Sequence, residues 1–462
     1  MESWGAVILA AGKGTRMRSR IPKVLHPVCG RPMLAHMLDI VRKVGIGSVT
    51  VVVPPEHTAV AQASGGGVQF VVQPEPLGTG HALACARPAL EGRFVHILSL
   101  YGDVPLLLPQ TLQRLIAHHE AAEAAITVLT ATEAPVPGLG RIIRDTNTGR
   151  LLRIVEEKEA SPQELQVREV NSGIYALNAA LCFPLLERLP RHPNGEFFLT
   201  DLAGLAIAQG MRVEAVSTDD PLEILGVNDR EALARAEVAM RQRLCRRWLQ
   251  AGVSILDPAT TYLDASVEIG QDTVIYPGTH LRGATRIGRD CRIGPYAVLQ
   301  DTVVGDGCVV VASFLEGAIL EEGVDVGPFS HLRPGSYLER GVHIGNFVEV
   351  KNSRLGQGVK SGHFSYLGDA TIGPEANIGA GTITCNFDGV RKHPTRIGAR
   401  AFIGSDTLLV APVAVGDGAA TGAGSVVNKD VPPGTLVVGM PARPIRRVEA
   451  QEGGLQGQEG RE

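Results

Sequence analysis

One short stretch near the start of the chain carries side chains suited to binding phosphate. Residues 9–17, LAAGKGTRM, place Lys13 and Arg16 in a glycine-containing turn after an apolar run, and Lys23 follows in IPKVL. Backbone N–H groups of such a turn can bind phosphate, and the cations can neutralise a triphosphate. The spacing fits neither a Walker loop nor a dinucleotide fingerprint. The stretch is therefore either a different kind of nucleotide loop or an ordinary turn with surface cations.

A carboxylate follows a second apolar run. Asp103 stands in LYGDVPL, directly after the run FVHILSL at 94–100. An acidic residue just past a strand lies at the mouth of a sheet, where a nucleotide and its metal would bind, and carboxylate oxygens suit a hard cation such as Mg²⁺. Alone, an aspartate in this place is usually a turn or helix cap.

A third candidate site interrupts the second half of the chain. The segment KSGHFSYLGD (360–369) contains His363, whose ordinary pKa of about 6.5 suits a general base near neutrality. In acyl transfer to an amine, a positioned base contributes roughly 10²–10⁴-fold. Arg333 and Lys351 could bind a sugar phosphate. The competing interpretation is a histidine that faces solvent at a turn.

The elements that must position the first two candidates alternate strand and helix. Buried strands are predicted at 6–10, 49–53, 68–72 and 94–100, and helical patterns lie between them, such as 33–44 and 109–121. This alternation predicts an α/β fold with a mostly parallel sheet, whose ligands bind beyond the carboxyl ends of the strands. An amphipathic helix follows at 229–251.

Beyond Pro258 apolar residues recur every six positions, as in Ile269, Ile275, Leu281, Ile287, Ile293 and Leu299; in Leu320, Val326, Leu332, Leu338, Ile344 and Val350; and in Ile397, Ile403, Leu409, Val415, Thr421 and Val427. A sustained hexapeptide period predicts a parallel β-helix of roughly nine coils, with the apolar residue inward. Glycine often follows the apolar residue, at 270, 288, 294, 327, 345, 398, 404 and 416, and we expect it to permit a turn conformation that a side chain would resist.

The period breaks at three places. Five-residue steps run from Val350 to Leu355 and from Leu367 to Ile372, and residues 386–395, NFDGVRKHPT, lack the hexapeptide character and should leave the coil as a loop. The polar, glycine-rich residues 449–462 are expected to be a disordered tail.

Composition excludes several classes of protein. The 462 residues carry a net charge of −4, so nothing points to nucleic acid or an anionic membrane as partner. The seven cysteines form no CxxC pair, which argues against a zinc cluster or a disulfide framework and favours a reducing compartment. The start has no basic region followed by a long apolar run, and the sequence has no 18-residue apolar stretch, so we expect a cytoplasmic protein without a membrane span.

The motifs together carry a resemblance. LAAGKGTRM, PKVL, QPEPLGTGHA, LYGDVPL, GRI, IVEEKEA, EVNSGIYA and GVND occur in the order found in sugar-phosphate nucleotidyltransferases. With GHFSYLGDA in the repeat region, the chain from about residue 5 to 445 resembles the bacterial bifunctional N-acetylglucosamine-1-phosphate uridyltransferases and glucosamine-1-phosphate N-acetyltransferases. We therefore expect a Rossmann-like nucleotidyltransferase domain at 1–227, a linker helix at 228–251 and an acetyltransferase domain at 252–448. The resemblance implies that the β-helix is left-handed.

The resemblance implies two reactions and their ligands. Glucosamine 1-phosphate would be acetylated from acetyl-CoA in the second domain. The first domain would then transfer uridylate from UTP to N-acetylglucosamine 1-phosphate with Mg²⁺, releasing pyrophosphate. The product, UDP-N-acetylglucosamine, is a precursor of peptidoglycan and lipopolysaccharide. Members of the family form homotrimers through the β-helix, with the acetyltransferase sites between subunits.

For the first domain the resemblance implies that Arg16 and Lys23 stabilise the transferring phosphate and that Asp103 and Asn228 hold Mg²⁺. Uridine nucleotide and product would be bound by Leu9, Ala10, Ala11, Gly12, Lys23, Gln73, Gly78, Thr79, Tyr101, Gly102, Asp103, Gly140, Glu156, Asn171 and Asn228. The family usually has an aromatic residue where this chain has Leu139.

For the second domain it implies that His363 is the general base. Glucosamine 1-phosphate would be bound by Arg333, Lys351, Tyr366 and Asn377, and acetyl-CoA by Ala380, Asn386, Phe387, Ser405, Ala423 and Arg443. The family usually has tyrosine at the position of Phe387, so a hydroxyl is missing here.

Two other interpretations remain open on the sequence. The β-helix could be an inert or regulatory trimerisation scaffold beside an active nucleotidyltransferase. Alternatively, the chain could be a non-enzymatic solenoid binder with a decayed α/β domain, against which Lys23, Asp103 and Asn228 argue.

Overall fold

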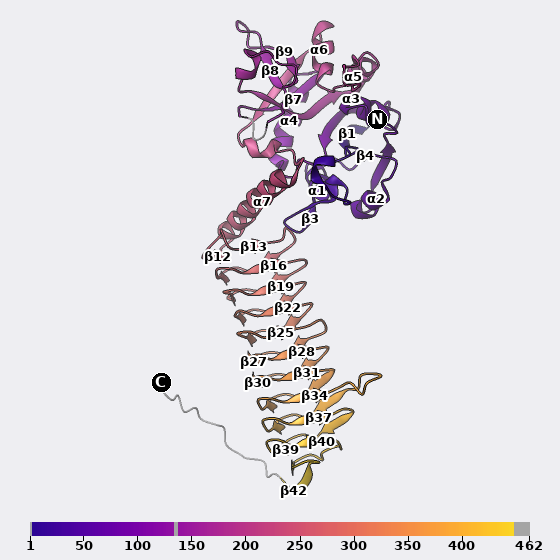
Figure 1. Cartoon of the computed structure of the whole chain (residues 1–462). Helices are drawn as coiled ribbons and strands as arrows, with labels where there is room; N and C mark the ends of the chain where they lie inside the picture. The colour runs from indigo at the N-terminus through magenta and orange to yellow at the C-terminus, as the bar shows by residue number, and fades with distance from the viewer. Residues whose placement is uncertain (1, 134–136, 448–462) are drawn as a thin grey trace. The chain divides into compact units, whose positions relative to one another are not determined.

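The computed structural model describes residues 2–133 and 137–447 and is drawn in Figure 1. The chain divides into two compact units, Met1–Met240 and Arg241–Glu462, and the division falls within one long helix, α7 (Arg230–Gln250). The division lies inside the segment predicted as a linker helix. The predicted disordered tail at 449–462 lies outside the described residues.

The first unit is built on a nine-stranded sheet. Its main path runs β11-β7-β10-β6-β1-β4-β5, with β8 beside β10 and β9 beside β8. The strands are β1 (Glu2–Leu9), β4 (Val49–Val53), β5 (Val68–Val72), β6 (Phe94–Tyr101), β7 (Ile126–Ala131), β8 (Arg141–Arg144), β9 (Leu151–Val155), β10 (Val170–Asn178) and β11 (Val213–Thr218); β2 (Pro27–Val28) and β3 (Arg31–Pro32) form a separate hairpin. The helices are α1 (Met33–Lys43), α2 (Thr58–Ser64), α3 (Thr79–Leu90), α4 (Pro109–Ala121), α5 (Ala179–Leu186), α6 (Asp201–Ala208) and α7, with short 3₁₀ turns at Thr15–Met17, Lys23–Leu25, Glu164–Gln166 and Pro221–Ile224.

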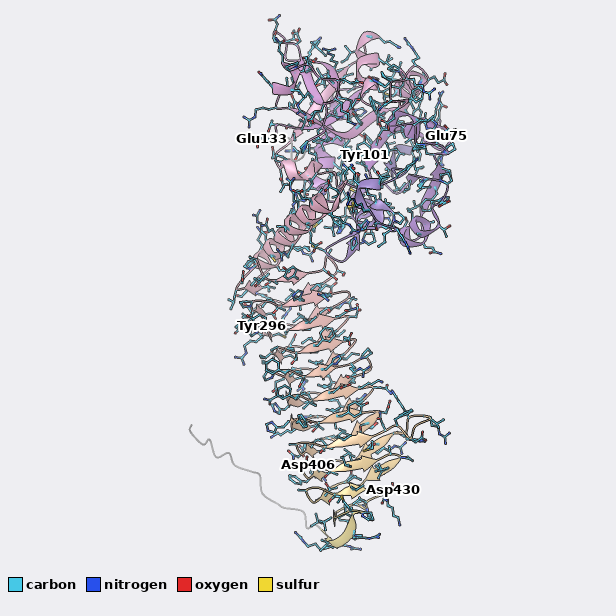
Figure 2. The ribbon with its side chains drawn as sticks, viewed as in Figure 1. Glu75, Tyr101, Glu133, Tyr296, Asp406 and Asp430 are labelled. Carbon is cyan, nitrogen blue, oxygen red and sulfur yellow. The ribbon has the colours of Figure 1, made fainter. Side chains whose placement is uncertain are left out.

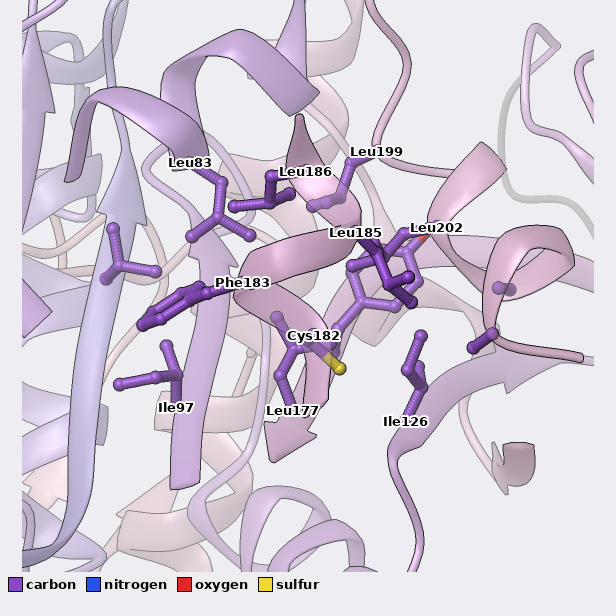
Figure 3. Packing of buried hydrophobic residues seen from close by; sticks show 14 of the residues in the cluster. Leu83, Ile97, Ile126, Leu177, Cys182, Phe183, Leu185, Leu186, Leu199 and Leu202 are labelled. Carbon is purple, nitrogen blue, oxygen red and sulfur yellow. The ribbon is translucent and has the colours of Figure 1, made fainter. Parts of the chain in front are cut away.

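The mostly parallel sheet predicted from the sequence is confirmed, although β10 is antiparallel to its neighbours and the side strand β8 pairs antiparallel with β10 and β9. β1 pairs in parallel with β4 and β6, but β10 lies antiparallel between β6 and β7. Successive side chains of β1 point to opposite faces of the sheet. Ala6 and Ile8 join the hydrophobic core on one side, whereas Val7 and Leu9 join the core on the other side. Figure 3 shows the latter core, where α5 places Phe183 against Ile97 of β6 and Leu83 of α3.

The second unit is a parallel β-helix of three sheets (Figure 1). The first sheet contains β12 (Ser254–Ile255), β15 (Val274–Ile275), β18 (Arg292–Ile293), β21 (Val309–Val310), β24 (Asp325–Val326), β27 (His343–Asn346), β30 (Lys360–His363), β33 (Asn377–Ile378), β36 (Phe402–Ile403), β39 (Ala420–Thr421), β41 (Thr435–Val438) and β42 (Arg443–Arg447). The second contains β13 (Tyr262–Leu263), β16 (His280–Arg282), β19 (Val298–Gln300), β22 (Phe314–Glu316), β25 (His331–Leu332), β28 (Glu349–Lys351), β31 (Tyr366–Gly368), β34 (Ile383–Cys385), β37 (Leu408–Val410) and β40 (Val426–Val427). The third contains β14 (Glu268–Ile269), β17 (Arg286–Ile287), β20 (Val303–Val304), β23 (Ile319–Leu320), β26 (Tyr337–Leu338), β29 (Arg354–Leu355), β32 (Ala370–Ile372), β35 (Thr395–Ile397) and β38 (Val413–Val415).

The breaks in the period correspond to short coils. Leu338 pairs with Leu355, and Val350 with Leu367, so each coil there is one residue short of three hexapeptides. Ile372 pairs with Ile397, and the intervening loop leaves the coil as predicted, with Thr395 already back in β35. Three further five-residue steps were not anticipated: Leu299 to Val304, Val310 to Leu315 and Leu315 to Leu320. As a result Leu299 pairs with Leu315 and Val304 with Leu320, and each of these coils is two residues short.

The repeat glycines are needed for a different reason from the one expected. Of the eight positions, only Gly294 (φ 100°) and Gly327 (φ 111°) have a positive φ, so the conformational explanation is wrong for the other six. Those six lie where successive coils crowd together. A Cβ on Gly345 would lie 1.8 Å from the carbonyl oxygen of Gly362, and a Cβ on Gly270 would lie 2.5 Å from that of Gly288. Backbone contact between coils therefore excludes a side chain.

No helix within the described residues combines the length and apolar character that crossing a membrane requires.

Candidate active sites

The first unit contains a cavity of about 690 Å³ at the carboxyl ends of β1, β5 and β6. Twelve of the residues predicted to bind nucleotide, sugar or metal line this cavity: Leu9, Ala10, Ala11, Gly12, Lys23, Gln73, Gly78, Thr79, Tyr101, Asp103, Glu156 and Asn228. Figure 2 labels Tyr101 among the side chains of this unit. Leu139 also lines the cavity, so the apolar residue in place of the usual aromatic is part of its wall.

Four predicted residues do not line the cavity. Arg16 is exposed on the 3₁₀ turn Thr15–Met17. Gly102 donates its N–H to the Leu9 carbonyl at 3.0 Å and so joins the ends of β6 and β1. Asn171 donates its backbone N–H to the Gly140 carbonyl at 2.8 Å, so these two residues link β10 to the start of β8 behind the cavity wall.

Inside the cavity, side-chain oxygens of Asp103 and Asn228 both accept hydrogen bonds from one cation, Lys23. The Lys23 ammonium donates to the carboxylate of Asp103 and, at 3.0 Å, to Oδ1 of Asn228. The backbone brings them together, because the Val227 N–H donates to the Asp103 carbonyl at 2.9 Å. Carboxylate and amide oxygens already arranged around a positive charge fit Mg²⁺, which takes few protein ligands and fills its shell with water and phosphate oxygens. Elsewhere too, the described residues contain no cluster of three or more His, Cys, Asp or Glu that could hold a metal.

Two ionisable groups in the wall have pKa values raised by burial. The Glu156 carboxylate has a raised pKa chiefly because it is desolvated, although Thr200 Oγ1 donates to it at 2.8 Å. Burial likewise raises the pKa of Tyr101 above its usual value, so its phenol stays neutral. The cavity therefore offers a neutral donor and a carboxylate whose charge is poorly solvated until a ligand binds.

Sequence reasoning missed one wall of the cavity. Glu196 and Phe198 line it, and their segment is fastened to 77–80 by three hydrogen bonds: Phe197 N–H to Leu77 O (2.8 Å), Gly80 N–H to Phe197 O (2.9 Å) and Leu199 N–H to Thr79 Oγ1 (3.1 Å). Gly78 must be glycine, because its φ is 95° and a Cβ would lie 2.5 Å from Phe197 O. No local signal marks residues 196–199, since their partners are more than a hundred positions away.

The Gln73 amide is oriented by two neighbours. Its Nε2 donates to the Gly78 carbonyl at 3.0 Å and to Nδ1 of His81 at 3.1 Å. Both amide hydrogens are thereby used, which leaves Oε1 as the acceptor that a ligand would meet. His81 was also missed from the sequence.

In the second unit, His363 stands at an exposed corner between β30 and β31. It pairs with Asn346 on the coil before, and the continuing register places Ala380, Ser405 and Ala423 in the same column on the coils that follow. Backbone hydrogen bonds support this alignment: Asp406 N–H donates to Ala380 O at 2.7 Å, and Gly424 N–H to Ser405 O at 2.8 Å. The predicted base and three predicted acetyl-CoA residues thus share one edge.

The predicted sugar-phosphate residues lie on two different faces of the β-helix. Arg333, Lys351 and Tyr366 project from the second sheet, whereas Asn377 projects from β33 of the first. Arg333 is also paired with Glu349 at 3.0 Å. Because outward side chains on adjacent faces of a triangular coil diverge, one chain does not gather all four residues around a single ligand.

The loop 386–394 adds a cation that the sequence did not single out. Lys392 lies beside Lys351, and contact with its ammonium, together with its positive charge, lowers the pKa of Lys351. Asn386 is buried at the start of the loop with Nδ2 3.4 Å from the Tyr366 hydroxyl, whereas Phe387 is exposed. Arg443 is exposed on β42, whose register pairs it with Val438 at the end of the first sheet.

Comparisons with known proteins agree with both units. The family model described as a MobA-like NTP transferase domain matches residues 6–250, and hexapeptide-repeat models of bacterial transferases and of succinyl-transferase match 266–301 and 394–429. The "Bifunctional protein GlmU" of Pelobacter propionicus is 48% identical over 442 residues, covering 95% of this chain and 96% of its own. The proteins of the same name from Trichlorobacter lovleyi and Desulfitobacterium hafniense are 48% and 44% identical, covering 94% and 95% of this chain and 95% and 96% of their own.

The chain belongs to the GlmU family. It is a bifunctional enzyme of UDP-N-acetylglucosamine synthesis, with uridyltransferase and glucosamine-1-phosphate acetyltransferase activities. The resemblance drawn from the sequence is thereby confirmed, as are the Rossmann-like first unit and the left-handed β-helix.

Proposed function

We propose that the two reactions use separate sites, one in each unit. The observation that carries this proposal is the distribution of the predicted residues: one group lies around the cavity of the first unit, the other lies on the coils of the β-helix that include and surround His363, and no residue belongs to both groups. The nucleotide and acetyl-CoA substrates expected for the family suit these two environments.

In the first unit, a phosphate oxygen of N-acetylglucosamine 1-phosphate would attack the α-phosphorus of UTP, and the bond from the α-phosphorus to the bridging oxygen would break to release pyrophosphate. Lys23 would stabilise charge on the transferring phosphate, and Gln73 and Glu156 would orient base and sugar. Such transfers need positioning and charge stabilisation more than a covalent residue. Mg²⁺ held by Asp103 and Asn228 would neutralise the triphosphate. Arg16, exposed at the mouth, would reach the phosphates only by moving its side chain.

In the second unit, His363 would take a proton from the sugar amine as the nitrogen attacks the acetyl carbonyl; the carbon–sulfur bond then breaks and coenzyme A leaves as its thiol. Arg333, Lys351 and Lys392 would attract the sugar phosphate. Because Asn377 projects from a different face, we propose that the site is completed by a second chain in a homotrimer. The exposed aromatic side chains along one corner, Tyr296, Phe329, Phe347 and Phe364, support association through the β-helix. A cytoplasmic location is proposed as well, which the scattered cysteines without a CxxC pair support.

A paired assay tests the two-site proposal. Acetyl-CoA with glucosamine 1-phosphate should release free thiol, and UTP with N-acetylglucosamine 1-phosphate and Mg²⁺ should release pyrophosphate. His363→Ala should lower the first activity by at least about 10²-fold and spare the second, whereas Asp103→Ala should do the reverse. If either variant, still folded, lost both activities, the proposal would fail. Pyrophosphate without thiol from the unmodified protein would favour the scaffold interpretation.

A further inference from the structure

The loop 386–394 is held at both ends by one residue of the preceding coil, Asp369. Where the loop begins, Asn386 Nδ2 donates to the Asp369 carboxylate at 2.6 Å. Where it ends, the Thr395 N–H donates to the Asp369 carbonyl oxygen at 3.1 Å. Asp369 is itself fixed, because its N–H donates to the Lys351 carbonyl at 3.0 Å. One residue therefore fastens both ends of the loop to the coil.

The second carboxylate oxygen of Asp369 is also engaged. Asn352 occupies the same corner one coil earlier, and its Nδ2 donates to Oδ1 of Asp369 at 2.6 Å. Hydrogen bonds to a charged acceptor are stronger than neutral ones, so an ionised carboxylate suits two amide donors. The φ of Asp369 is 51°, a conformation that Asp and Asn tolerate better than other side chains.

The loop carries groups that the proposed acetyl transfer needs. It brings the Lys392 ammonium to Lys351, and it places Asn386 within 3.4 Å of the Tyr366 hydroxyl. The loop packs on Asp369 through Asn386, which is 6% exposed. A displacement of either loop end would thus move a cation and an amide at the site.

We propose that Asp369 is a positioning residue for acetyl transfer, which clasps the loop so that Asn386 and Lys392 stand at the acetyltransferase site. This inference rests on the proposed function and deepens it. Without the carboxylate, the start of the loop loses its short, charged partner, and the buried Asn386 amide keeps only its longer contact with the Tyr366 hydroxyl. Small misplacements of binding groups are costly in catalysis, because the bound geometry must be reached before reaction.

The first test compares Asp369→Asn with Asp301→Asn. Asp301 lies at the same corner several coils earlier with a φ of 50°, and its Oδ1 accepts from the Ala284 N–H at 2.8 Å. Both substitutions keep the preference for this backbone conformation and one acceptor oxygen. At position 369 that oxygen must serve two amide donors, Asn352 and Asn386, and the new NH2 group faces one of them, whereas at position 301 one oxygen is enough for the Ala284 N–H. We expect Asp369→Asn to lower acetyltransferase kcat/KM about tenfold or more, mainly through KM for glucosamine 1-phosphate and acetyl-CoA. Its uridyltransferase rate should be unchanged, and Asp301→Asn should match the unmodified protein in both assays.

The second test reverses the hydrogen bond. Asn386→Asp alone sets two carboxylates against each other and should reduce acetyl transfer more than Asp369→Asn does. The double variant D369N/N386D again pairs one amide with one carboxylate. Its acetyltransferase kcat/KM should be at least about five times that of N386D. A residue that only supported the fold would not show this rescue in KM.

Three outcomes would overturn the inference: unchanged acetyltransferase kinetics in Asp369→Asn, the same loss in Asp301→Asn, or a double variant no better than N386D. Absence of acetyl transfer in the unmodified protein would instead contradict the proposed function, so the two failures are distinguishable.

Discussion

At the scale of single residues, His192 joins two carboxylates beside the wall of the nucleotide cavity. Its Nδ1 lies 2.8 Å from Glu159 and its Nε2 2.8 Å from Asp201, and its ring packs on Phe198. Burial opposes the imidazolium, but the hydrogen bonds and charges of Asp201 and Glu159 outweigh it and raise the pKa of His192 above 6.5. A raised folded-state pKa gives stability that is fully present below pH 6.5 and is lost as pH rises through the folded value.

We therefore expect His192→Gln to lower the thermal midpoint by a few degrees at pH 6 and by progressively less towards pH 9. Differential scanning calorimetry across this range would measure the effect. His57→Gln is a suitable control, because His57 Nδ1 contacts the backbone carbonyls of Pro54 and Pro55 rather than a carboxylate. An equal loss at both pH values would show that charge on His192 is irrelevant.

At the scale of elements, crowding between coils explains the hexapeptide glycines. Gly345→Ala would drive a Cβ to 1.8 Å from the Gly362 carbonyl, whereas at Gly362 itself a Cβ would meet only His343 Nε2, at 4.0 Å. We expect Gly345→Ala to destabilise the β-helix by about 1–3 kcal/mol or more, as overpacking does, and Gly362→Ala to be nearly neutral. Urea unfolding followed by far-UV circular dichroism would compare them. Equal stabilities would exclude the crowding explanation.

Elements defined by local pattern were predictable, and those defined by distant partners were not. β4, β5 and α4 have the predicted bounds, because alternation and helical spacing are properties of the segment itself. The antiparallel insertion of β10 and the clamp of 196–199 onto 77–80 depend on residues far apart in the chain. At the nucleotide site the motif residues were found, but Glu196, Phe198 and His81 were not. At the second site Lys392 and Asp369 acquire their roles only when the loop folds back.

At the scale of the whole molecule, the residues predicted to bind the sugar phosphate lie on two faces of the β-helix, and this arrangement predicts how subunits share a site. Lys351 and Asn377 project from different faces, so in a cyclic trimer each site would take one from each of two neighbours. Lys351→Ala and Asn377→Ala should each be nearly inactive in acetyl transfer alone. Co-expressed, every mixed trimer would contain one intact site, so activity should recover to at most about a third of the unmodified level. No recovery in verified mixed trimers would place both residues in one chain's site.

The column of His363, Ala380, Ser405 and Ala423 also fixes a length. Neighbouring strands lie about 4.8 Å apart, so the three coil steps from His363 to Ala423 span about 14 Å. The three later residues of this column, Ala380, Ser405 and Ala423, have small side chains. Distance along this edge is therefore set by the number of coils. If a long, thin co-substrate lay along the edge with its reactive end at His363, the coil count, and not the shape of a pocket, would determine which residues meet its far end.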